Sequence, residues 1–186
     1  MQQPKKQSYA IEEYFAQEEK AEMRSEYYQG EIFAMTGGSI NHNQIVLNLI
    51  RVFSSLPKPC RTFATDLRLR VEAHDLFTYP DVMVVCGKPE FYAGRTDTIT
   101  NPVALLEVLS KTTEAYDRGK KFEFYRALPS LREYILIDQY RAHVDQFILK
   151  EGNWQLIDVA EVLRFDSVDF TCKVQEIYQD VDFDLS

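Results

Sequence analysis

The sequence has few cysteines and no long apolar segment. Its three cysteines, Cys60, Cys86 and Cys172, lie far apart and form no CxxC pair, so we expect neither a disulfide framework nor a zinc site. No run approaches the roughly 20 apolar residues that a transmembrane helix needs, and the polar residues 1–8 contain no hydrophobic signal region. These absences predict a protein with no membrane span that remains in the reducing cytoplasm.

An excess of positive charge is also missing. The chain has 21 Lys and Arg against 29 Asp and Glu, a net charge of −8, which argues against a broad basic surface for nonspecific nucleic-acid binding. A metal site would itself concentrate carboxylates, so the acidic balance does not exclude an enzyme that acts on phosphates. Seven arginines could still form a local basic face: Arg51, Arg61, Arg68, Arg70, Arg118, Arg126 and Arg132.

Several common catalytic motifs are absent as well. The chain has no HExxH zinc motif, no P-loop, no Rossmann glycine pattern and no nucleophile elbow. It also has no internal repeat and no low-complexity linker that would mark a domain boundary. With 186 residues, 45% hydrophobic composition, 12 Phe and 11 Tyr, it can bury one substantial core. We therefore expect a single domain over residues 1–186.

The spacing of apolar residues predicts a mixed α/β fold. Helical periodicity occurs in residues 9–20, 40–56 and 117–128. Strand patterns occur in residues 25–28, 31–35, 62–71, 79–86, 103–109, 133–137, 143–149 and 154–157. A short strand and a helical turn are expected in residues 168–186. This order of elements predicts a central mixed β-sheet flanked by helices, in the α/β or mixed α+β class.

Glu107 is the most informative residue of the sequence. It interrupts residues 103–109, a nearly continuous apolar run of the kind found in buried central strands. Burying an ionised carboxylate costs several kcal/mol unless the group is paired, protonated or bound to a metal ion. We therefore expect a compensating partner for Glu107. An internal salt bridge or an exposed strand end is the purely structural alternative.

A second acid, Asp81, follows Pro80 at the start of another apolar strand, residues 79–86. Alone, an aspartate beside a proline often marks only a turn. If the two strands are adjacent, their backbones lie roughly 4.8 Å apart, and Asp81 and Glu107 could hold one small divalent cation. Such a cation stabilises charge on a phosphate and lowers the pKa of a bound water. The pair thus indicates a metal-dependent phosphodiesterase, with strand adjacency as the assumption.

These residues resemble the motif of the PD-(D/E)XK nuclease superfamily, whose fold is a mixed sheet between helices. The flanking segments are similar to one branch of it, the Uma-type restriction endonuclease family, once a domain of unknown function. The similar segments are Gly30-Glu31-Ile32, His42-Asn43, Asn101-Pro102, Glu107-Val108-Leu109-Ser110, Asp117-Arg118-Gly119-Lys120-Lys121-Phe122 and Pro129-Ser130-Leu131-Arg132-Glu133-Tyr134. The resemblance covers nearly the whole chain. It implies a restriction-endonuclease-like core, Mg²⁺ or Mn²⁺ as cofactor, and nucleic acid, with DNA expected, as substrate.

The lysine of the superfamily motif should follow the glutamate by two residues, where this chain has Leu109. The resemblance implies that the amine comes instead from the next helix, with Lys121 and Lys120 as candidates. Lys121 shares a helical row with Tyr125 and is expected to face inward, where its ammonium could orient water or steady the phosphate. Lys120 is the second choice, as a substrate-binding residue. Solvent exposure of both lysines is the ordinary alternative.

Two further site residues are expected, Glu31 from the resemblance and His42 from its position in the chain. Glu31 is expected as an upstream acid and third metal or water ligand, with Glu26 as a weaker competitor. His42 lies near the start of a predicted helix, where backbone amides favour anions, and could contact a substrate phosphate. An exposed hairpin acid and a capping or core histidine are the structural alternatives for Glu31 and His42.

The leading hypothesis is therefore a Mg²⁺-dependent endonuclease, expected to form a homodimer because two-fold dimers are the commonest soluble assembly. A second hypothesis is a nuclease-fold binding or assembly module without catalysis, which the acidic balance and Leu109 favour. A small-molecule enzyme that uses the same carboxylates is a third, and no positive feature of the sequence supports it.

Overall fold

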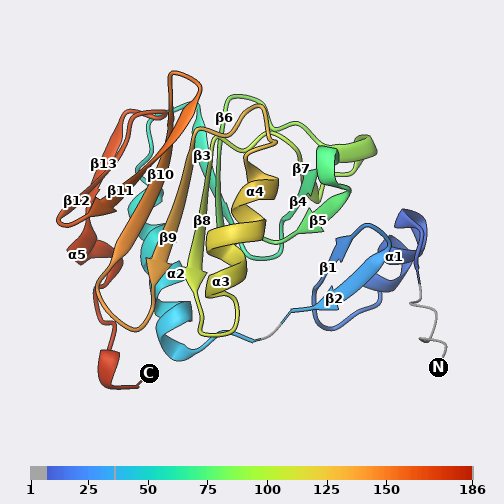
Figure 1. Ribbon diagram of the computed structural model, residues 1–186, viewed down its shortest axis with the longest axis horizontal. Helices are drawn as coiled ribbons and strands as arrows, with labels where there is room; N and C mark the ends of the chain where they lie inside the picture. The colour runs from blue at the N-terminus through green and yellow to red at the C-terminus, as the bar shows by residue number, and fades with distance from the viewer. Residues whose placement is uncertain (1–7, 36, 186) are drawn as a thin grey trace.

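A six-stranded mixed β-sheet forms the centre of the computed structural model, which describes residues 8–35 and 37–185 (Figure 1). The strands lie in the order β11-β10-β9-β8-β6-β3. Neighbours are antiparallel except β8 and β9, which are parallel. The strands are β3 Cys60–Ala64, β6 Val82–Cys86, β8 Ala104–Leu109, β9 Glu133–Asp138, β10 Val144–Lys150 and β11 Asn153–Val159.

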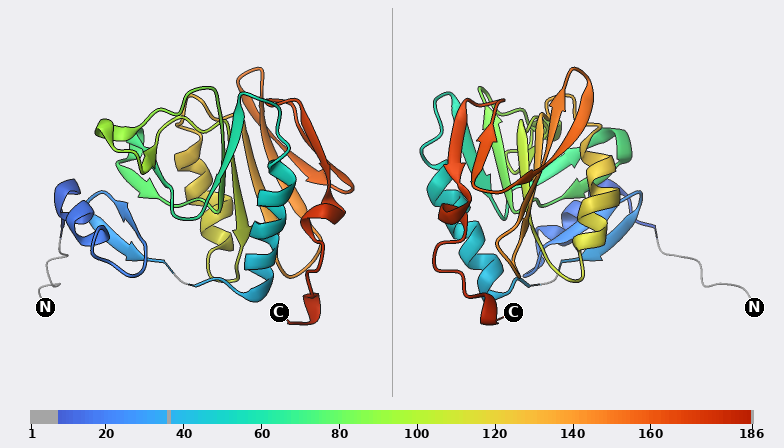
Figure 2. Two further views of the ribbon diagram at one scale, coloured as in Figure 1. Left: turned by 180° about the vertical axis from the view of Figure 1, so that it is seen from behind. Right: turned by 60° about the vertical axis from the view of Figure 1, so that its left-hand side comes forward.

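Helices cover both faces of this sheet (Figures 1 and 2). Helix α2 lies on one face, and a continuous helical segment made of α3, η3 and α4 lies on the other. Their bounds are α2 Ile40–Phe53, α3 Glu114–Tyr116, η3 Asp117–Lys121 and α4 Phe122–Tyr125, with η3 a π-helical turn. The other helices and 3₁₀ turns are α1 Ile11–Glu18, α5 Val174–Ile177, η1 Glu72–His74, η2 Tyr92–Gly94 and η4 Phe183–Leu185.

Strand β8 is buried along its whole length, as its apolar sequence predicts. Successive side chains of a strand point to opposite faces, so its residues divide between two cores. Leu106 and Val108 pack in the core that α2 covers, whereas Leu105 and Leu109 pack in the core that α4 covers. Glu107 shares the face of the latter pair and therefore points toward the helical segment that carries η3.

A second sheet of five strands, in the order β2-β1-β5-β4-β7, adjoins the first. Its strands are β1 Ser25–Tyr28, β2 Glu31–Ala34, β4 Arg68–Val71, β5 Leu76–Thr78 and β7 Thr98–Ile99. Four aromatic side chains, Tyr14, Phe15, Tyr27 and Phe77, form a core between α1 and this sheet. A separate hairpin pairs β12, Val162–Phe165, with β13, Phe170–Lys173.

One of the expected strands is divided between the sheets, and another is shorter than expected. Residues 62–71 belong partly to β3 and partly to β4, because the chain turns at Thr65, which has a φ of 51°. Residues 79–81 link β5 to β6, so the second strand begins only at Val82. The two links lie together, and the amide of Thr65 donates to the carbonyl of Asp81 at 3.2 Å. This junction between the sheets is where the candidate site lies.

The other expected elements differ from the observed ones mainly at their ends, whereas strands β5, β7 and β12 were not expected. The first helix is shorter than expected, and the third begins earlier, at Glu114. The strand and helical turn expected in residues 168–186 correspond to β13 and α5, and Ser186 lies outside the described residues. The expected mixed α/β architecture, with a central mixed sheet flanked by helices, is confirmed.

The cysteine prediction is wrong in one respect. Cys60 and Cys86 form a disulfide, although 26 positions separate them in the chain. They are direct partners in the antiparallel pairing of β3 with β6, which spacing in the sequence does not reveal. Cys172 is a free and buried thiol. Within the described residues, no helix is long and apolar enough to cross a membrane.

Candidate active site

A cleft of about 590 Å³ opens at the junction of the two sheets. Its walls come from β1, the start of α2, the links around Thr65 and Asp81, the end of β8, and the turn η3. Segments that are far apart in the chain therefore meet here. The titratable side chains that line it are Arg24, Glu26, His42, Asp66, Tyr79, Asp81, Glu107, Tyr116, Asp117, Lys121 and Tyr140.

Asp81 and Glu107 lie on adjacent strands, which was the assumption behind the predicted pair. Strands β6 and β8 are antiparallel, with Val82 opposite Leu106, and one further step along this register sets Asp81 opposite Glu107. Oδ2 of Asp81 accepts the backbone N–H of Val108 at 2.7 Å. Both carboxylates therefore reach the same cleft from neighbouring strands.

Glu107 is buried, with 4% of its surface exposed, and it has the compensating partner that its apolar strand requires. Its Oε1 lies 2.9 Å from Nζ of Lys121 and accepts the hydroxyl of Tyr125 at 2.8 Å. Burial raises the pKa of Glu107 to about 8, an effect that the nearby Lys121 ammonium opposes. The internal salt bridge anticipated as an alternative thus exists, and it lies inside an acidic cleft.

Lys121 is the one lysine that lines the cleft among the described residues. Three carboxylates surround its Nζ: Glu107 at 2.9 Å, Asp117 at 3.4 Å and Glu26 at 4.0 Å. Burial lowers the pKa of Lys121, but these acids outweigh burial and hold the pKa well above its ordinary value. Lys120 is exposed, and its Nζ lies 5.3 Å from the ring centroid of Phe124, outside the cleft.

The π-helical turn η3 explains why Asp117 and Lys121 both face the sheet. They are the two buried residues of this turn, and both line the cleft. Single π turns within α-helices occur frequently at functional sites, because the wider turn re-aims side chains. The i, i+4 spacing of the pair is the sequence signal that could have identified Asp117, which sequence reasoning left unassigned. Tyr125 was likewise used only to orient the helix, although it holds Glu107.

Glu26, rather than Glu31, is the hairpin acid that reaches the cleft. Glu26 lies on β1 and accepts a hydrogen bond from the hydroxyl of Thr78 on the neighbouring strand. Glu31 begins β2 opposite Tyr28 and is not among the residues that line the cleft. The two glutamates lie on the same face of the hairpin, because Glu31 pairs with Tyr28, two residues after Glu26 on the same strand face. Glu31 differs in lying at the turn end of the hairpin.

His42 lies where the sequence suggested, in the first turn of α2 and on the wall of the cleft. The hydroxyl of Ser39 caps this helix by accepting the N–H of His42 at 3.1 Å. The ring Nε2 lies 3.2 Å from Oδ1 of Asp81. Burial lowers the pKa of His42, but the hydrogen bond and charge of Asp81 outweigh burial and raise it above its ordinary value.

None of the seven arginines that could form a local basic face lines the cleft. Arg68 and Arg70 are buried beneath aromatic rings and paired with acids, because long cationic side chains can pack their stems against apolar surface. Arg118 pairs with Glu114 and Asp145. The cleft is therefore dominated by carboxylates.

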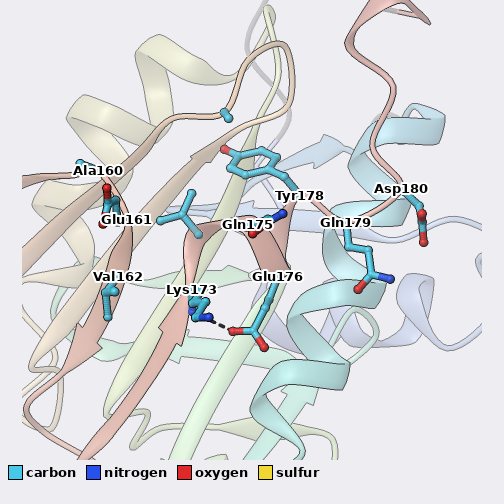
Figure 3. Close-up of a pocket in the computed structure, with 11 residues that line it drawn as sticks. Ala160, Glu161, Val162, Lys173, Gln175, Glu176, Tyr178, Gln179 and Asp180 are labelled. Atoms are coloured by element: carbon cyan, nitrogen blue, oxygen red, sulfur yellow. Dashed lines mark hydrogen bonds between the residues drawn. The ribbon is translucent and has the colours of Figure 1, made fainter.

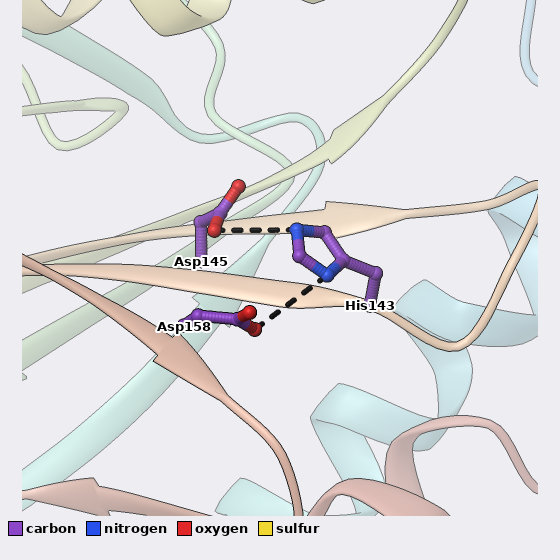
Figure 4. A group of neighbouring side chains, drawn as sticks. All are labelled: His143, Asp145 and Asp158. Carbon is purple, nitrogen blue, oxygen red and sulfur yellow. Dashed lines mark ion pairs between the residues drawn. The ribbon is translucent and has the colours of Figure 1, made fainter.

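A group of potential metal ligands outside the cleft lies on the β10–β11 hairpin (Figure 4). Among the described residues, His143, Asp145 and Asp158 form the one trio of His, Cys, Asp or Glu whose ligand atoms all lie within 4.8 Å of one another. Its groups already satisfy each other: Nε2 and Nδ1 of His143 face Asp145 and Asp158, and Arg118 lies 2.5 Å from Asp145. The cleft acids stand farther apart, around the ammonium of Lys121.

A larger hollow, about 1030 Å³, lies beside α5 and the β12–β13 hairpin (Figure 3). Its charged side chains, among them Glu161, Lys173, Glu176 and Asp180, are exposed. Glu176 accepts the backbone N–H of Lys173 at 2.8 Å and so caps α5. The hollow lacks the convergence of buried acids that marks the cleft, and the cleft is the better candidate for an active site.

Comparisons with known proteins point in the same direction. The family model Uma2, described as "Putative restriction endonuclease", matches residues 11–174. Two uncharacterized proteins of Synechocystis sp. (strain ATCC 27184 / PCC 6803 / Kazusa) are similar in sequence. One, sll1609, is 39% identical over 140 residues, which cover 73% of this chain and 77% of that protein. The other, slr1290, is 33% identical over 177 residues, which cover 92% of each.

A solved structure shares the fold. The crystal structure of a protein from Anabaena variabilis ATCC 29413, described as "a putative nuclease belonging to DUF820", matches with a TM-score of 0.70. The match covers 90% of this chain and 96% of that one at 20% sequence identity. The restriction-endonuclease-like fold and the family resemblance expected from the sequence are therefore confirmed.

Proposed function

The chain belongs to the Uma2 family of restriction-endonuclease-like proteins, and from this premise we propose that it is a metal-dependent endonuclease. The proposed reaction is hydrolysis of phosphodiester bonds in nucleic acid, with DNA as the substrate. One observation carries the proposal: Asp81, Glu107 and Lys121 come from three separate elements and converge on one cleft. Two acids on adjacent strands with an amine beside them match the needs of phosphodiester hydrolysis.

The donor set suits a small, hard cation. Asp81, Glu107 and Glu26 offer only carboxylate oxygens, the ligands that Mg²⁺ takes in proteins. We assign the third position to Glu26 in place of Glu31, because Glu26 lines the cleft and Glu31 does not. A bound Mg²⁺ or Mn²⁺ would stabilise charge on the phosphate and lower the pKa of a coordinated water.

The other cleft residues have roles that follow from their contacts. The ammonium of Lys121 lies beside Glu107 and can face a phosphate oxygen, where a positive charge stabilises the anionic transition state. His42 holds Oδ1 of Asp81, and the backbone N–H of Val108 holds Oδ2, so the carboxylate is oriented from both sides. His42 also stands in the first turn of α2, where a phosphate would be favoured.

The proposal is tested by incubating the purified protein with each of four substrates: supercoiled plasmid, linear duplex DNA, single-stranded DNA and RNA. Each incubation contains either Mg²⁺ in about a hundredfold excess over the protein or EDTA in place of Mg²⁺. We expect cleavage of DNA in Mg²⁺ and none in EDTA. Cleavage of RNA alone would overturn the assignment of substrate. Cleavage that persists in EDTA would overturn the metal dependence.

A second candidate function is a nuclease-fold binding module without catalysis, and the acidity of the cleft favours it. Glu26, Glu107 and Asp117 all lie within 4.0 Å of the single ammonium of Lys121. Such a site could be a self-satisfied ion-pair network. Calorimetric titration with Mn²⁺ separates the two functions: saturable binding that Asp81→Asn removes supports the endonuclease, and absence of binding supports the module.

The assembly and the cellular compartment are also proposals. We propose a homodimer, because cutting both strands of a duplex is served by two sites related by two-fold symmetry. Light scattering coupled to size exclusion tests this directly, and a monomer mass at all concentrations would contradict it. We propose the cytoplasm as the compartment. Fractionation of cells tests that proposal. The Cys60–Cys86 disulfide argues against a reducing compartment, because disulfides are rare in cytosolic proteins.

A further inference from the structure

Asp117 is a buried carboxylate of the cleft that the proposed metal site does not use. Only 3% of its surface is exposed, and its Oδ1 lies 3.4 Å from Nζ of Lys121. Burial raises the pKa of Asp117, whereas the ammonium of Lys121 and a side-chain hydrogen bond from Thr113 lower it. An acid buried at this energetic cost needs a partner, and the ammonium of Lys121 is the cation it contacts.

The backbone that carries Asp117 is held on both sides. Its N–H donates to the carbonyl of Thr113 at 2.8 Å, and its carbonyl accepts the buried hydroxyl of Tyr134 at 3.0 Å. The ring of Tyr134 stacks on Phe122, with centroids 5.4 Å apart. Because Asp117 begins the π turn that Lys121 ends, these contacts set the positions of both side chains.

Glu107 cannot serve a divalent cation and the ammonium of Lys121 equally well. Its Oε1 lies 2.9 Å from Nζ of Lys121. A cation bound to Glu107 would compete for that carboxylate and repel the ammonium. Glu26, 4.0 Å from Lys121, is the proposed third metal ligand, and once bound to the cation it would likewise be less available to pair with the ammonium of Lys121. Asp117 is then the acid that remains for the ammonium.

We propose that Asp117 is a positioning residue, which holds the ammonium of Lys121 in the cleft while Glu107 binds the divalent cation. This inference rests on the proposed function and names a residue that the function needs. Asp117 acts through Lys121, without contact to the cation or the phosphate. Supporting residues of this kind fix the geometry of the groups that react, and their loss misplaces those groups.

The test compares Asp117→Asn with a matched control, Asp145→Asn. Asp145 is also a buried aspartate paired with a cation of the same π turn, Arg118, but it lies outside the cleft. For Asp117→Asn we expect kcat for DNA cleavage to fall by about 10- to 100-fold with KM little changed, because a misplaced group is felt in the chemical step. Asp145→Asn should keep the kcat of the wild type.

Two readouts distinguish positioning from a merely structural role. Asp117→Asn should bind Mn²⁺ in calorimetry as tightly as the wild type, and Asp117→Glu should recover part of the lost kcat. Acetylation of Lys121, followed by peptide mass analysis, should remain slow in the wild type with Mn²⁺ and become faster in Asp117→Asn with Mn²⁺. An unchanged kcat in Asp117→Asn, or loss of its Mn²⁺ affinity, would overturn the proposal.

Failure of this inference can be distinguished from failure of the proposed function. If the wild type binds Mn²⁺ and cuts DNA while Asp117→Asn behaves identically, only the role of Asp117 is wrong. If the wild type binds no Mn²⁺ and cuts nothing, the endonuclease proposal fails and this inference fails with it. Acetylation of Lys121 that is equally slow in both proteins with Mn²⁺ bound would count against Asp117 alone.

Discussion

Nζ of Lys121 lies 2.9 Å from Oε1 of Glu107, so an amine stands beside this glutamate although the residue two positions after it is Leu109. Leu109 points to the same face of β8 as Glu107 but is 2% exposed and packed in the core beneath α4. The helical segment over that face carries Lys121 instead. A side chain on this helical segment therefore reaches Glu107 on the same face of β8 that a lysine in place of Leu109 would share.

Replacing Lys121 with Met should abolish most activity. The substitution keeps an unbranched chain in the buried position but removes the positive charge that faces the proposed phosphate. We expect the cleavage rate to fall by about 100- to 1000-fold, the usual effect of losing one group that stabilises a transition-state charge. The matched control is Lys120→Met, since Lys120 is exposed and outside the cleft. Similar rates for the two variants would refute the role of Lys121.

Removing the hydroxyl of Tyr125 should destabilise the fold. This hydroxyl donates to Glu107 at 2.8 Å in a fully buried setting, so Tyr125→Phe leaves a carboxylate with one donor fewer. The expected loss in the free energy of unfolding is about 1 to 3 kcal/mol, measured by urea denaturation at pH 7. Tyr28→Phe serves as the control, because Tyr28 is only half-buried and its hydroxyl makes no hydrogen bond within the described residues. Equal stability of wild type and Tyr125→Phe would contradict the prediction.

The acids of the site that could be predicted from the sequence differ in character from their immediate neighbours in the chain. Glu107 stands out because it is a charge within an apolar strand, and Asp81 because it opens the neighbouring apolar strand. The i, i+4 spacing of Asp117 with Lys121 and the helical row that Lys121 shares with Tyr125 indicate a common helix face, but no local pattern shows that this face docks against Glu107 on β8. The π turn that re-aims Asp117 is likewise invisible to a 3.6-residue periodicity.

The division into two sheets was missed for a related reason. Apolar and aromatic residues continue on both sides of Thr65, so the pattern suggests one strand through a position where the chain changes sheets. The pairing of Cys60 with Cys86 depends on the register of β3 against β6, a long-range property. Glu26 and Glu31 lie on the same face of one short hairpin, so which of them reaches the cleft depends on how the hairpin is placed against the rest of the fold.

Asp97 should make stability sensitive to acid. Two nitrogens of Arg95 each lie 2.8 Å from its carboxylate, and these bonds hold the pKa of Asp97 well below its ordinary 3.8. An acid whose pKa is lower in the folded state than in the unfolded state stabilises the fold at pH values above its unfolded-state pKa. This stabilisation is lost as the pH falls through its folded-state pKa. Asp97→Asn should therefore be less stable than the wild type near neutrality, and the gap should narrow below about pH 4.

The check is the urea midpoint of both proteins across the pH range from neutrality to strong acid. A difference between the two midpoints that stays constant over the whole range would contradict this assignment, because an uncharged contribution has no reason to vary with pH. The carboxylate is partly exposed, so the effect should also weaken in high salt.

The cysteines offer a chemical test of the fold. The protein denatured without reductant should take up one equivalent of iodoacetamide, at Cys172, because Cys60 and Cys86 are joined. After reduction it should take up three. Mass spectrometry of the intact chain reads both values. Three equivalents without reductant would show that the β3–β6 disulfide does not form under the conditions of preparation.

The central claim is that Asp81 and Glu107 hold the cation that drives phosphodiester cleavage. The most direct measurement is the initial rate of Mg²⁺-dependent DNA cleavage by three proteins prepared side by side: the wild type, Asp81→Asn and Glu107→Gln. We expect both variants to remain folded and to lose about 1000-fold or more of the rate, because each loses a ligand of the catalytic metal. Equal rates in all three would contradict the claim and exclude this cleft as the active site.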